Sequence, residues 1–405
     1  MGGKVALERS PPRTIRTLTF TTLYPNEVQP HHGVFVENRL RHLLRTGEVD
    51  THVVAPVPWF PLRGAIFGRY GDQARVPNKE TRHGVEICHP RYIAIPKVGM
   101  SVAPTSLFLA TFGMMKRKLS QFNYDIIDAH YFYPDGVAAM MLGRTLNRPV
   151  VITARGTDIN LIPRFFLPRR QIQFAGREAA GIVAVSQALA DALVELGVPR
   201  DRITVLRNGV DLEIFRPGNR EVARRTMGIK GPILLSVGHL IERKGHHIAI
   251  AALPGLPGYT LLIAGDGPER SRLVTLSIAL GVQNRVKFLG NIPHETLRET
   301  YEAADALVLA SSREGWPNVL LESMACGTPV VASPIWGNPE VVSAPEAGIL
   351  MASRTPEGVV EAVEKLFRKL PVRAATRAFA ERFSWHDASV GQLQLFRDVL
   401  ARWKA

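Results

Sequence analysis

The strongest constraint on the fold is a strand–helix–strand pattern late in the chain. Residues 306–310 are an apolar run typical of a buried strand, and a loop rich in glycine and proline follows. Residues 318–325 have helical spacing without a breaker, and Gly327 and Pro329 end that helix. Apolar residues 330–332 then begin another strand. The pattern predicts a βαβ unit with two parallel strands in one sheet.

Two carboxylates flank the start of the predicted helix. Glu314 lies in the loop before it, and Glu322 lies about one turn inside it. Open parallel sheets bind ligands at the carboxyl ends of their strands, where both side chains can point. The helix N-terminus adds unpaired N–H groups and the positive end of a dipole. The stretch therefore predicts a nucleotide diphosphate at the helix start, with carboxylates accepting hydrogen bonds from hydroxyl groups.

Strands and helices alternate along most of the chain, which predicts doubly wound parallel sheets. The turn-rich segment Asn208-Gly209-Val210-Asp211 interrupts this alternation, and the same pattern restarts after it. We expect one Rossmann-like domain over residues 1–207 and a second over 208–384, with a ligand cleft between them. Residues 385–405 are amphipathic and predict a C-terminal helix that crosses back to the first domain. The fold class is α/β.

Composition narrows the biochemical class. The chain of 405 residues exceeds one ordinary core, which favours two domains. Cys88 and Cys326 are its only cysteines and lie in apolar contexts, which favours a reducing cytoplasm over a disulfide framework. No signal peptide or membrane-spanning run is visible. The formal charge of +14 is compatible with a basic proteome or with docking on an anionic membrane, at its inner face. No nucleic-acid-binding module is recognisable.

A second loop carries adjacent cations. Residues 238–245 follow the first strand of the second half, and Arg243 and Lys244 can neutralise a diphosphate there. The alternative is a solvated surface turn. Gly265-Asp266-Gly267-Pro268 also lies between a strand and a helix, but it lacks the third glycine of a dinucleotide fingerprint. A dehydrogenase is therefore poorly supported.

In combination, these motifs resemble the family 4 retaining glycosyltransferases of the GT-B fold, over nearly the whole chain. The likeness rests on the Glu314-to-Glu322 spacing, the loop Gly-x-Leu-x-x-x-Lys-Gly at 238–245, the turn at 265–268 and the joint at 208–211. Segments 32–39, 133–136 and 154–158 are similar to the subgroup that includes teichuronic-acid and exopolysaccharide glycosyltransferases.

The resemblance implies roles on the donor side, in the second domain. Glu314 would contact hydroxyls of the donor sugar, and Glu322 those of the ribose. Lys244 would hold the diphosphate together with backbone amides of the helix start. His239 stands where relatives usually have arginine, so the diphosphate would depend on Lys244 with Arg243. The full donor-binding set is Gly33, His239, Arg243, Lys244, Asp266, Glu314, Gly315, Trp316, Pro317, Asn318, Val319 and Glu322.

On the acceptor side, the first domain supplies fewer candidates. Gly33 would line the cleft, and His130 corresponds to a histidine that many relatives place beside the reaction centre. Arg155 stands where many relatives have histidine. An arginine is no base at neutral pH, but it can bind a carboxylate or phosphate. The alternative for Arg155 is a structural ion pair with Asp158 or with another neighbouring residue. Together with Glu314, His130 and Arg155 form the candidate catalytic set.

The resemblance implies a glycosyltransferase that retains anomeric configuration. We expect a nucleotide-diphosphate sugar as donor, a UDP-sugar being favoured, and a cell-surface polysaccharide or a glycan linked to polyprenyl diphosphate as acceptor. No metal or other cofactor is expected, since Lys244 and the helix dipole can neutralise the diphosphate. A nucleotide-sugar 2-epimerase and a non-catalytic nucleotide-sugar-binding protein of the same fold remain the alternatives.

Overall fold

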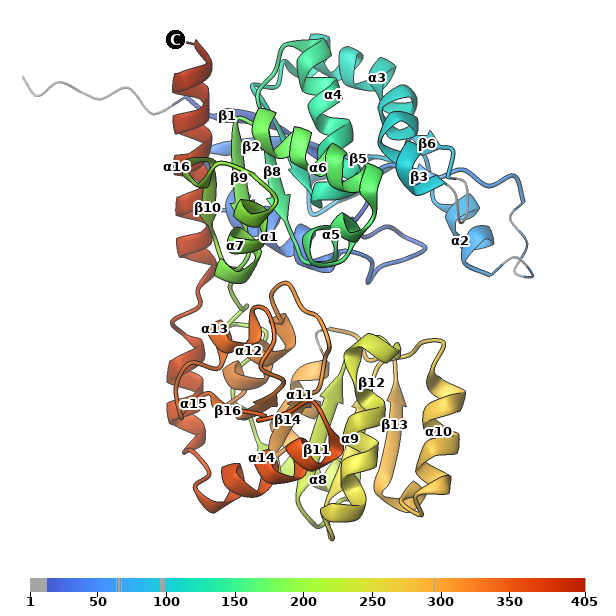
Figure 1. Cartoon of the computed structure of the whole chain (residues 1–405), viewed down its shortest axis with the longest axis vertical. Helices are drawn as coiled ribbons and strands as arrows, with labels where there is room; N and C mark the ends of the chain where they lie inside the picture. Colours follow the sequence, from blue (N-terminus) through green and yellow to red (C-terminus); the bar gives the residue numbers. More distant parts are fainter. Residues whose placement is uncertain are drawn as a thin grey trace, which may run out of the picture. The chain divides into compact units, whose positions relative to one another are not determined.

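The computed structural model describes residues 13–62, 64, 66, 68–94, 99–294 and 296–404. The chain divides into two compact units. The first takes in the chain as far as Ala184, then Ala192–Leu206 and the segment from Ser389 onward. The second takes in Val185–Asp191 and Arg207–Ala388. Figure 1 labels the helices and strands of both units. Within the described residues, no helix is both long and apolar enough to cross a membrane.

The first unit is built on an eight-stranded sheet that is parallel except at one edge. Its central strands are fully buried and mostly apolar, as expected of a sheet covered on both faces, with Asp128 and His130 of β7 as exceptions. β4 pairs antiparallel with β5 and forms the edge, which the alternating pattern of the sequence did not predict. In spatial order the strands are β10 (Ile203–Val205), β9 (Gly181–Ala184), β8 (Val150–Ala154), β7 (Ile126–His130), β1 (Ile15–Phe20), β2 (Val49–Val54), β5 (Val85–Cys88) and β4 (Lys79–Arg82).

Two segments of this unit, 49–57 and 87–92, do not form continuous strands. Each is broken instead, and the ends pair as a separate two-stranded sheet, β3 (Val57–Pro58) and β6 (Arg91–Tyr92). The prolines at 56 and 90 explain the breaks, because proline donates no hydrogen bond to a sheet ladder.

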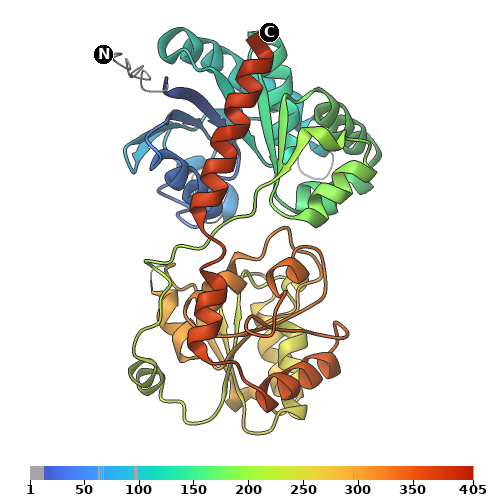
Figure 2. The ribbon, with the colours of Figure 1, turned by 90° about the vertical axis from the view of Figure 1, so that its left-hand side faces the viewer.

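Helices of the first unit include one from the far end of the chain. Its helices are α1 (Val34–Leu44), α2 (Arg69–Arg75), α3 (Ala103–Phe122), α4 (Val137–Leu146), α5 (Thr157–Asn160), α6 (Phe166–Glu178) and part of α7 (Gln187–Glu195). The C-terminal helix, α16 (Trp385–Lys404), begins in the second unit and continues in the first. Its Leu393, Phe396 and Val399 share a buried cluster with strand residues such as Ile15 and Val183. Figure 2 shows α16 in red running along the first unit.

The second unit has a six-stranded, wholly parallel sheet. In spatial order it comprises β13 (Val286–Gly290), β12 (Thr260–Ala264), β11 (Ile233–Val237), β14 (Ala306–Leu309), β15 (Val330–Ala332) and β16 (Gly348–Leu350). The helices are α8 (Arg220–Met227), α9 (His246–Ala252), α10 (Arg270–Ala279), α11 (Leu297–Ala303), α12 (Asn318–Ala325), α13 (Asn338–Val341), α14 (Pro356–Arg368) and α15 (Arg373–Ala380). The predicted βαβ unit is β14–α12–β15, confirmed with its strands parallel. The two doubly wound sheets confirm the predicted α/β fold class.

Candidate functional site

The second unit has a topological switch point beside β11. From β11 the chain proceeds to β12 and β13 on one side, and later to β14, β15 and β16 on the other. The loops that leave β11 and β14 therefore diverge at the carboxyl edge of neighbouring strands. Crevices of this kind are where open parallel sheets bind ligands. The two loops selected from the sequence, 238–245 and 311–317, are the two that flank this point.

These loops pack backbone against backbone, and glycines permit the approach. Gly245 has a left-handed backbone conformation, with φ of +74°. A Cβ atom there would lie 1.9 Å from the carbonyl oxygen of Ala310. Gly265, after β12, has φ of +137°, and its Cβ would lie 2.0 Å from the carbonyl oxygen of Gly238. The amide of Ser312 also donates to the carbonyl of Arg243 at 2.8 Å. The glycines of the sequence motif thus hold the loops together.

Glu314 lies at the centre of an ion-pair cluster between the two loops. Its Oε1 accepts from Lys244 Nζ and from Ser311 Oγ, both at 2.7 Å, and Arg243 Nη1 lies 3.7 Å from Oε2. Arg243 Nη1 also donates to the carbonyl of Arg313 at 2.7 Å. The Glu314 side chain is buried, which raises its pKa, but Lys244 and then Arg243 outweigh burial and the net pKa is lowered. The carboxylate is therefore ionised at neutral pH.

Glu322 lies on α12 and is held by two side chains that the sequence did not single out. Its Oε2 accepts from the hydroxyl of Tyr301 at 2.8 Å, and its Oε1 lies 3.2 Å from His294 Nε2. Burial, and then the charge of Glu322, raises the pKa of Tyr301, so that hydroxyl stays protonated and donates. Tyr301 had the pattern of a core aromatic, and His294 lies in a loop after β13, so neither gave a sequence signal. Both orient the Glu322 carboxylate.

The remaining donor-side candidates differ in position. Trp316 is buried and donates from Nε1 to the carbonyl of Asn208 at 3.0 Å, which makes it a structural anchor of the loop. Gly315 and Pro317 are buried beside it, whereas Val319 is half-buried. Asn318, the first residue of α12, accepts from Asn208 Nδ2 at 3.3 Å. His239 and Asp266 are exposed, and Asp266 Oδ1 accepts from the amide of Gly267 at 2.8 Å.

The first unit has its own switch point, between β1 and β7. The loops after these strands are joined by Asp135, a fully buried carboxyl group. Asp135 accepts from the amide of Thr22 at 2.7 Å and from the hydroxyls of Thr21 and Thr22. Burial raises the pKa of Asp135 to about 8 despite these hydrogen bonds. The segment Tyr-Pro-Asp-Gly singled out in the sequence thus uses its aspartate to fix the loop after β1.

His130 lies at the carboxyl end of β7 and is fully buried. Its Nδ1 is 2.6 Å from Arg155 Nη2, and its Nε2 is 3.1 Å from Asp128 Oδ2. A guanidinium only donates, so Nδ1 is the acceptor and the proton is on Nε2, which is near the Asp128 carboxylate but makes no aligned hydrogen bond among the described residues. Burial lowers the pKa of His130, which keeps the ring neutral. The structure therefore places both ring nitrogens against protein groups.

Asp128 is in turn held by the C-terminal helix. Its Oδ2 accepts from Gln392 Nε2 at 3.0 Å, and Gln392 Oε1 accepts from Arg39 Nε at 2.6 Å. Arg39 also donates to the carbonyl of Leu206 at 3.1 Å. Gln392 lies on α16 and Arg39 on α1, so these contacts join distant parts of the sequence behind His130. A glutamine in an amphipathic helix offered no signal for this role.

Arg155 is not paired with Asp158 as an ion pair. Asp158 instead accepts from backbone amides, including those of Arg155 and Phe132. The Arg155 guanidinium lies 5.3 Å from the ring centre of Phe35 and donates through Nη2 to His130. Among the described residues its Nε and Nη1 have no hydrogen-bond partner, although the side chain is buried. Burial, and then Arg39, lowers the pKa of Arg155 to about 9.

Gly33 precedes α1 in a left-handed conformation, with φ of +73°. A Cβ atom there would lie 2.3 Å from the carbonyl oxygen of Leu23. The absence of a side chain at Gly33 thus lets the loop that contains Leu23 pack closely against it. His32, just before it, has Nε2 2.9 Å from the carbonyl oxygen of Thr22. The predicted contact of Gly33 with substrate stays a prediction.

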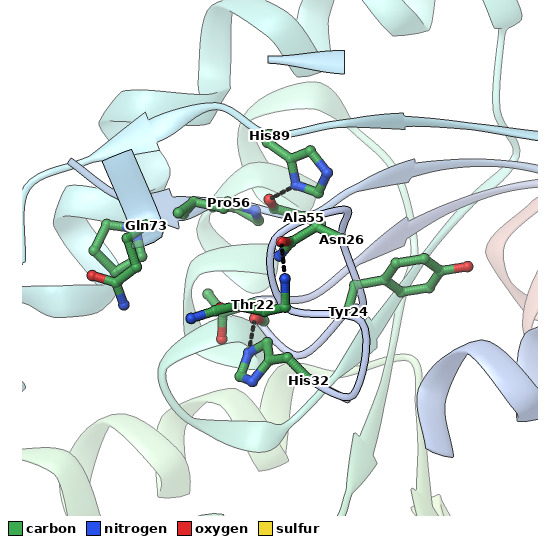
Figure 3. A pocket seen from close by; sticks show the side chains of 11 residues that line it. Thr22, Tyr24, Asn26, His32, Ala55, Pro56, Gln73 and His89 are labelled. Carbon is green, nitrogen blue, oxygen red and sulfur yellow. Dashed lines mark hydrogen bonds between the residues drawn. The ribbon is translucent and has the colours of Figure 1, made fainter. Parts of the chain in front are cut away.

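The same loop forms one wall of a pocket in the first unit, shown in Figure 3. The pocket has a volume of about 250 Å³ and lies at the carboxyl ends of β1 and β2. Opposite the loop is the segment 55–58, where His89 Nδ1 lies 2.9 Å from the carbonyl oxygen of Ala55. Its polar lining consists of hydroxyl, amide and imidazole groups, namely those of Thr22, Tyr24, Asn26, Gln29, His32, Gln73 and His89.

Comparison with known proteins agrees with this architecture. Residues 219–383 match the model of glycosyl transferases group 1, and residues 32–214 match that of Glycosyltransferase Family 4. A D-inositol 3-phosphate glycosyltransferase of Acidothermus cellulolyticus is 34% identical over 69% of this chain and 68% of its own. The putative teichuronic acid biosynthesis glycosyltransferase TuaC of Bacillus subtilis is 28% identical, over 80% and 82% of the two chains.

Solved structures support the same fold. Sucrose-phosphate synthase from Thermosynechococcus elongatus superposes with a TM-score of 0.76 at 20% identity, over 96% of this chain and all of its own. HepE of Anabaena in complex with UDP superposes with a TM-score of 0.71 at 20% identity, over 95% of this chain and all of its own. The two doubly wound sheets and these structural neighbours show the GT-B fold, and the two family models and the relative at 34% identity show the family. The chain belongs to the family 4 glycosyltransferases, and it is an enzyme of glycosyl transfer.

Proposed function

We propose that the protein transfers a sugar from a nucleotide-diphosphate sugar, a UDP-sugar in the first place, to a cell-surface polysaccharide or a lipid-linked glycan precursor. The observation that carries this proposal is the cluster at the switch point of the second unit. Lys244 and Arg243 meet Glu314 there, just before α12, and Glu322 lies one turn into that helix. Cations and a helix start beside two carboxylates suit a ligand with a diphosphate between two hydroxyl-bearing sugars.

Each group of the cluster has a role in this proposal. The diphosphate binds at the start of α12, where Lys244 and Arg243 neutralise its charge. Glu314 accepts hydrogen bonds from the donor sugar, and Glu322 accepts from the ribose. Tyr301 keeps Glu322 oriented through the hydrogen bond at 2.8 Å. Solved structures of HepE contain UDP, UDP with glucose, or UDP-glucose, which supports a uridine nucleotide as the first choice.

The proposed reaction proceeds with retention. The acceptor oxygen forms a bond to the anomeric carbon on the face from which the diphosphate oxygen departs, and the acceptor proton passes to that departing oxygen. The protein then supplies position and charge neutralisation, and no side chain has to act as a base. The arrangement around His130 supports this route, because both its ring nitrogens face protein groups. Lys244 and the helix dipole serve where other enzymes use a metal ion, so we propose that transfer is metal-independent.

For the acceptor, we propose the pocket of Figure 3 together with Arg155. The hydroxyl, amide and imidazole groups of the pocket suit the hydroxyls of a sugar. Arg155 has two guanidinium nitrogens without partners among the described residues, which suits a carboxylate or phosphate on the acceptor. The names of two relatives, an inositol-phosphate and a teichuronic acid glycosyltransferase, support an acceptor that combines hydroxyls with an anionic group.

The decisive experiment is a donor screen followed by product analysis. UDP-, GDP- and ADP-sugars are incubated with the purified protein, with and without EDTA, and nucleotide release is measured. Active donors are then offered sugar acceptors with and without a phosphate, and NMR reads the anomeric configuration of the product. We expect release that rises with acceptor, a retained configuration and no effect of EDTA.

A matched pair of variants tests the site itself. Glu322→Gln should weaken nucleotide binding about tenfold in calorimetry, the loss of one charge-assisted hydrogen bond. Glu361→Gln, a change on the exposed face of α14, should bind as the wild type does. Equal affinities in both variants would remove Glu322 from the site. Interconversion of a nucleotide sugar without acceptor would establish an epimerase, and nucleotide binding without acceptor-dependent release would establish a binding protein.

A further inference from the structure

Three consecutive large apolar side chains are exposed where α6 begins. Phe165, Phe166 and Leu167 have exposed fractions of 48%, 68% and 54%. Single exposed apolar residues are normal, but a run of three is a cost to solubility unless another surface covers it. Apolar patches of this kind mark sites of interaction with proteins or membranes.

The run continues along α6 as a stripe in which aromatic and basic residues alternate. Phe166, Arg170 and Phe174 are four residues apart and so lie on one face of the helix. Arg170 Cζ is 5.0 Å from the ring centre of Phe166, and Arg144 of α4 lies 5.5 Å from that of Phe174. We define the α6 patch as the exposed residues Phe165, Phe166, Leu167, Arg169, Arg170 and Phe174.

A neighbouring segment extends the α6 patch. Gln171, one turn after Leu167, donates from Nε2 to the carbonyl of Ser101 at 3.1 Å. Ser101 belongs to the 3-10 helix Gly99–Val102, whose Met100 and Val102 are exposed. A second segment with exposed apolar side chains is therefore tied to α6 by a hydrogen bond.

The charge along the α6 patch is mostly positive, with Glu178, the last residue of α6, 4.0 Å from Arg144 as the acidic exception. Between residues 164 and 177 the sequence contains four arginines, at 164, 169, 170 and 177, and no acidic residue. All four are exposed. Arginines that surround exposed aromatics are typical of segments that lie in the headgroup region of a membrane, with rings at the acyl boundary and cations on lipid phosphates.

We propose that the α6 patch docks the first unit on an anionic lipid surface. Charge complementarity favours an anionic lipid surface over a second copy of the chain. In a symmetric pair of chains the four arginines of one patch would face the four arginines of the other and repel them. The aromatic and aliphatic side chains supply buried apolar area, and the arginines bind headgroup phosphates. The α6 patch consists only of surface residues of the first unit, so its docking does not depend on which nucleotide sugar the second unit binds.

The test measures binding of the full chain to vesicles. Vesicles of phosphatidylcholine alone, or of equal parts phosphatidylcholine and phosphatidylglycerol, are sedimented with the protein at low and high salt. We expect salt-sensitive binding to the anionic vesicles only. Arg169→Ala/Arg170→Ala should weaken that binding about 25-fold, because each arginine at an anionic surface contributes about fivefold. Phe165→Ser/Phe166→Ser/Leu167→Ser should also weaken it, and should do so even at low salt.

A matched control separates the patch from the overall charge. Arg368→Ala/Lys369→Ala removes two adjacent exposed cations from the second unit and should bind vesicles as the wild type does. Absence of wild-type binding to anionic vesicles would overturn the proposal. Equal losses in the Arg169/Arg170 and Arg368/Lys369 variants would also overturn it, since binding would then follow net charge. A wild-type dimer in ultracentrifugation that the triple serine variant dissociates, with vesicle binding unchanged, would assign the patch to self-association.

Discussion

Replacing Lys244 by methionine tests the ion-pair cluster quantitatively. Lys244 Nζ and Glu314 Oε1 are 2.7 Å apart, so at an effective dielectric constant of about 20 their attraction amounts to about 6 kcal/mol. Withdrawing the ammonium from water offsets roughly half of this. Arg243, at 3.7 Å from Glu314, remains in the variant. We therefore expect Lys244→Met to lower the free energy of unfolding of the second unit by about 3 kcal/mol at neutral pH.

The loss should depend on pH in a defined direction. The folded-state pKa of Glu314 lies below its ordinary value, so its contribution to stability is present above the unfolded pKa of about 4.3 and disappears as the pH falls through the folded pKa. Lys244→Met raises the folded pKa. Its cost is therefore largest near neutrality, shrinks as the pH falls through the raised folded pKa of the variant, and disappears only below the lowered folded pKa of the wild type, where the carboxyl group is protonated in both proteins.

Calorimetric unfolding across that pH range measures the effect. A loss of about 3 kcal/mol corresponds to a fall in Tm of about 6–12 °C for a unit of this size. Lys365→Met, on the exposed face of α14, is the control and should leave Tm unchanged. Lys244→Met/Glu314→Gln should recover part of the loss, because the buried charge is gone. A cost below about 0.5 kcal/mol, or one that is the same at all pH values, would refute the reasoning.

Three further predictions concern the same unit. Glu322→Ala should raise the Kd for nucleotide about 100-fold in calorimetry, whereas Glu314→Ala should reduce kcat for transfer more than nucleotide affinity; wild-type transfer by both variants would exclude the assigned roles. Gly245→Ala should lower the free energy of unfolding by at least about 4 kcal/mol in thermal unfolding, because the new Cβ atom would lie 1.9 Å from a carbonyl oxygen. Gly258→Ala is the control and should cost about 1 kcal/mol, because Gly258 has φ of +83° but open space around it. Similar costs for the two variants would contradict the tight packing of the loops. Burial raises the pKa of Cys326 to about 12, so a thiol reagent at about pH 8 should modify it only after denaturation, and rapid reaction of the native chain would disprove its burial.

Features encoded in short stretches were predicted well from the sequence. The helix over residues 318–325 was predicted to the residue, because breakers flank a stretch with helical spacing. Ser186, directly before α7, is a residue type that favours helix N-termini, and its Oγ accepts from the amide of Leu189 at 3.3 Å. The cations of the loop at 238–245 and the carboxylate at 314 were both singled out, and the switch point brings them together. Local chemistry determined each of these.

Features that depend on distant partners were not predicted. Tyr301 and His294 hold Glu322 across more than twenty residues of sequence, and neither lies in a recognisable motif. Gln392 reaches Asp128 from the other end of the chain, which no spacing rule can anticipate. An ion pair between Arg155 and Asp158 was one alternative from the sequence. Asp158 instead accepts hydrogen bonds from backbone amides, and the Arg155 guanidinium donates to His130 on β7. Tertiary packing decided these contacts.

The placement of α16 also bears on the order in which the chain folds during synthesis. Leu393, Phe396 and Val399 belong to the same buried cluster as Ile15, at the opposite end of the sequence. The N-terminal part of the first unit therefore leaves the ribosome with an incomplete hydrophobic core. That core stays incomplete until the second unit and then α16 have been synthesised. A nascent chain stopped before residue 389 would expose that cluster to water and to chaperones. The part of the enzyme that is translated first is completed last.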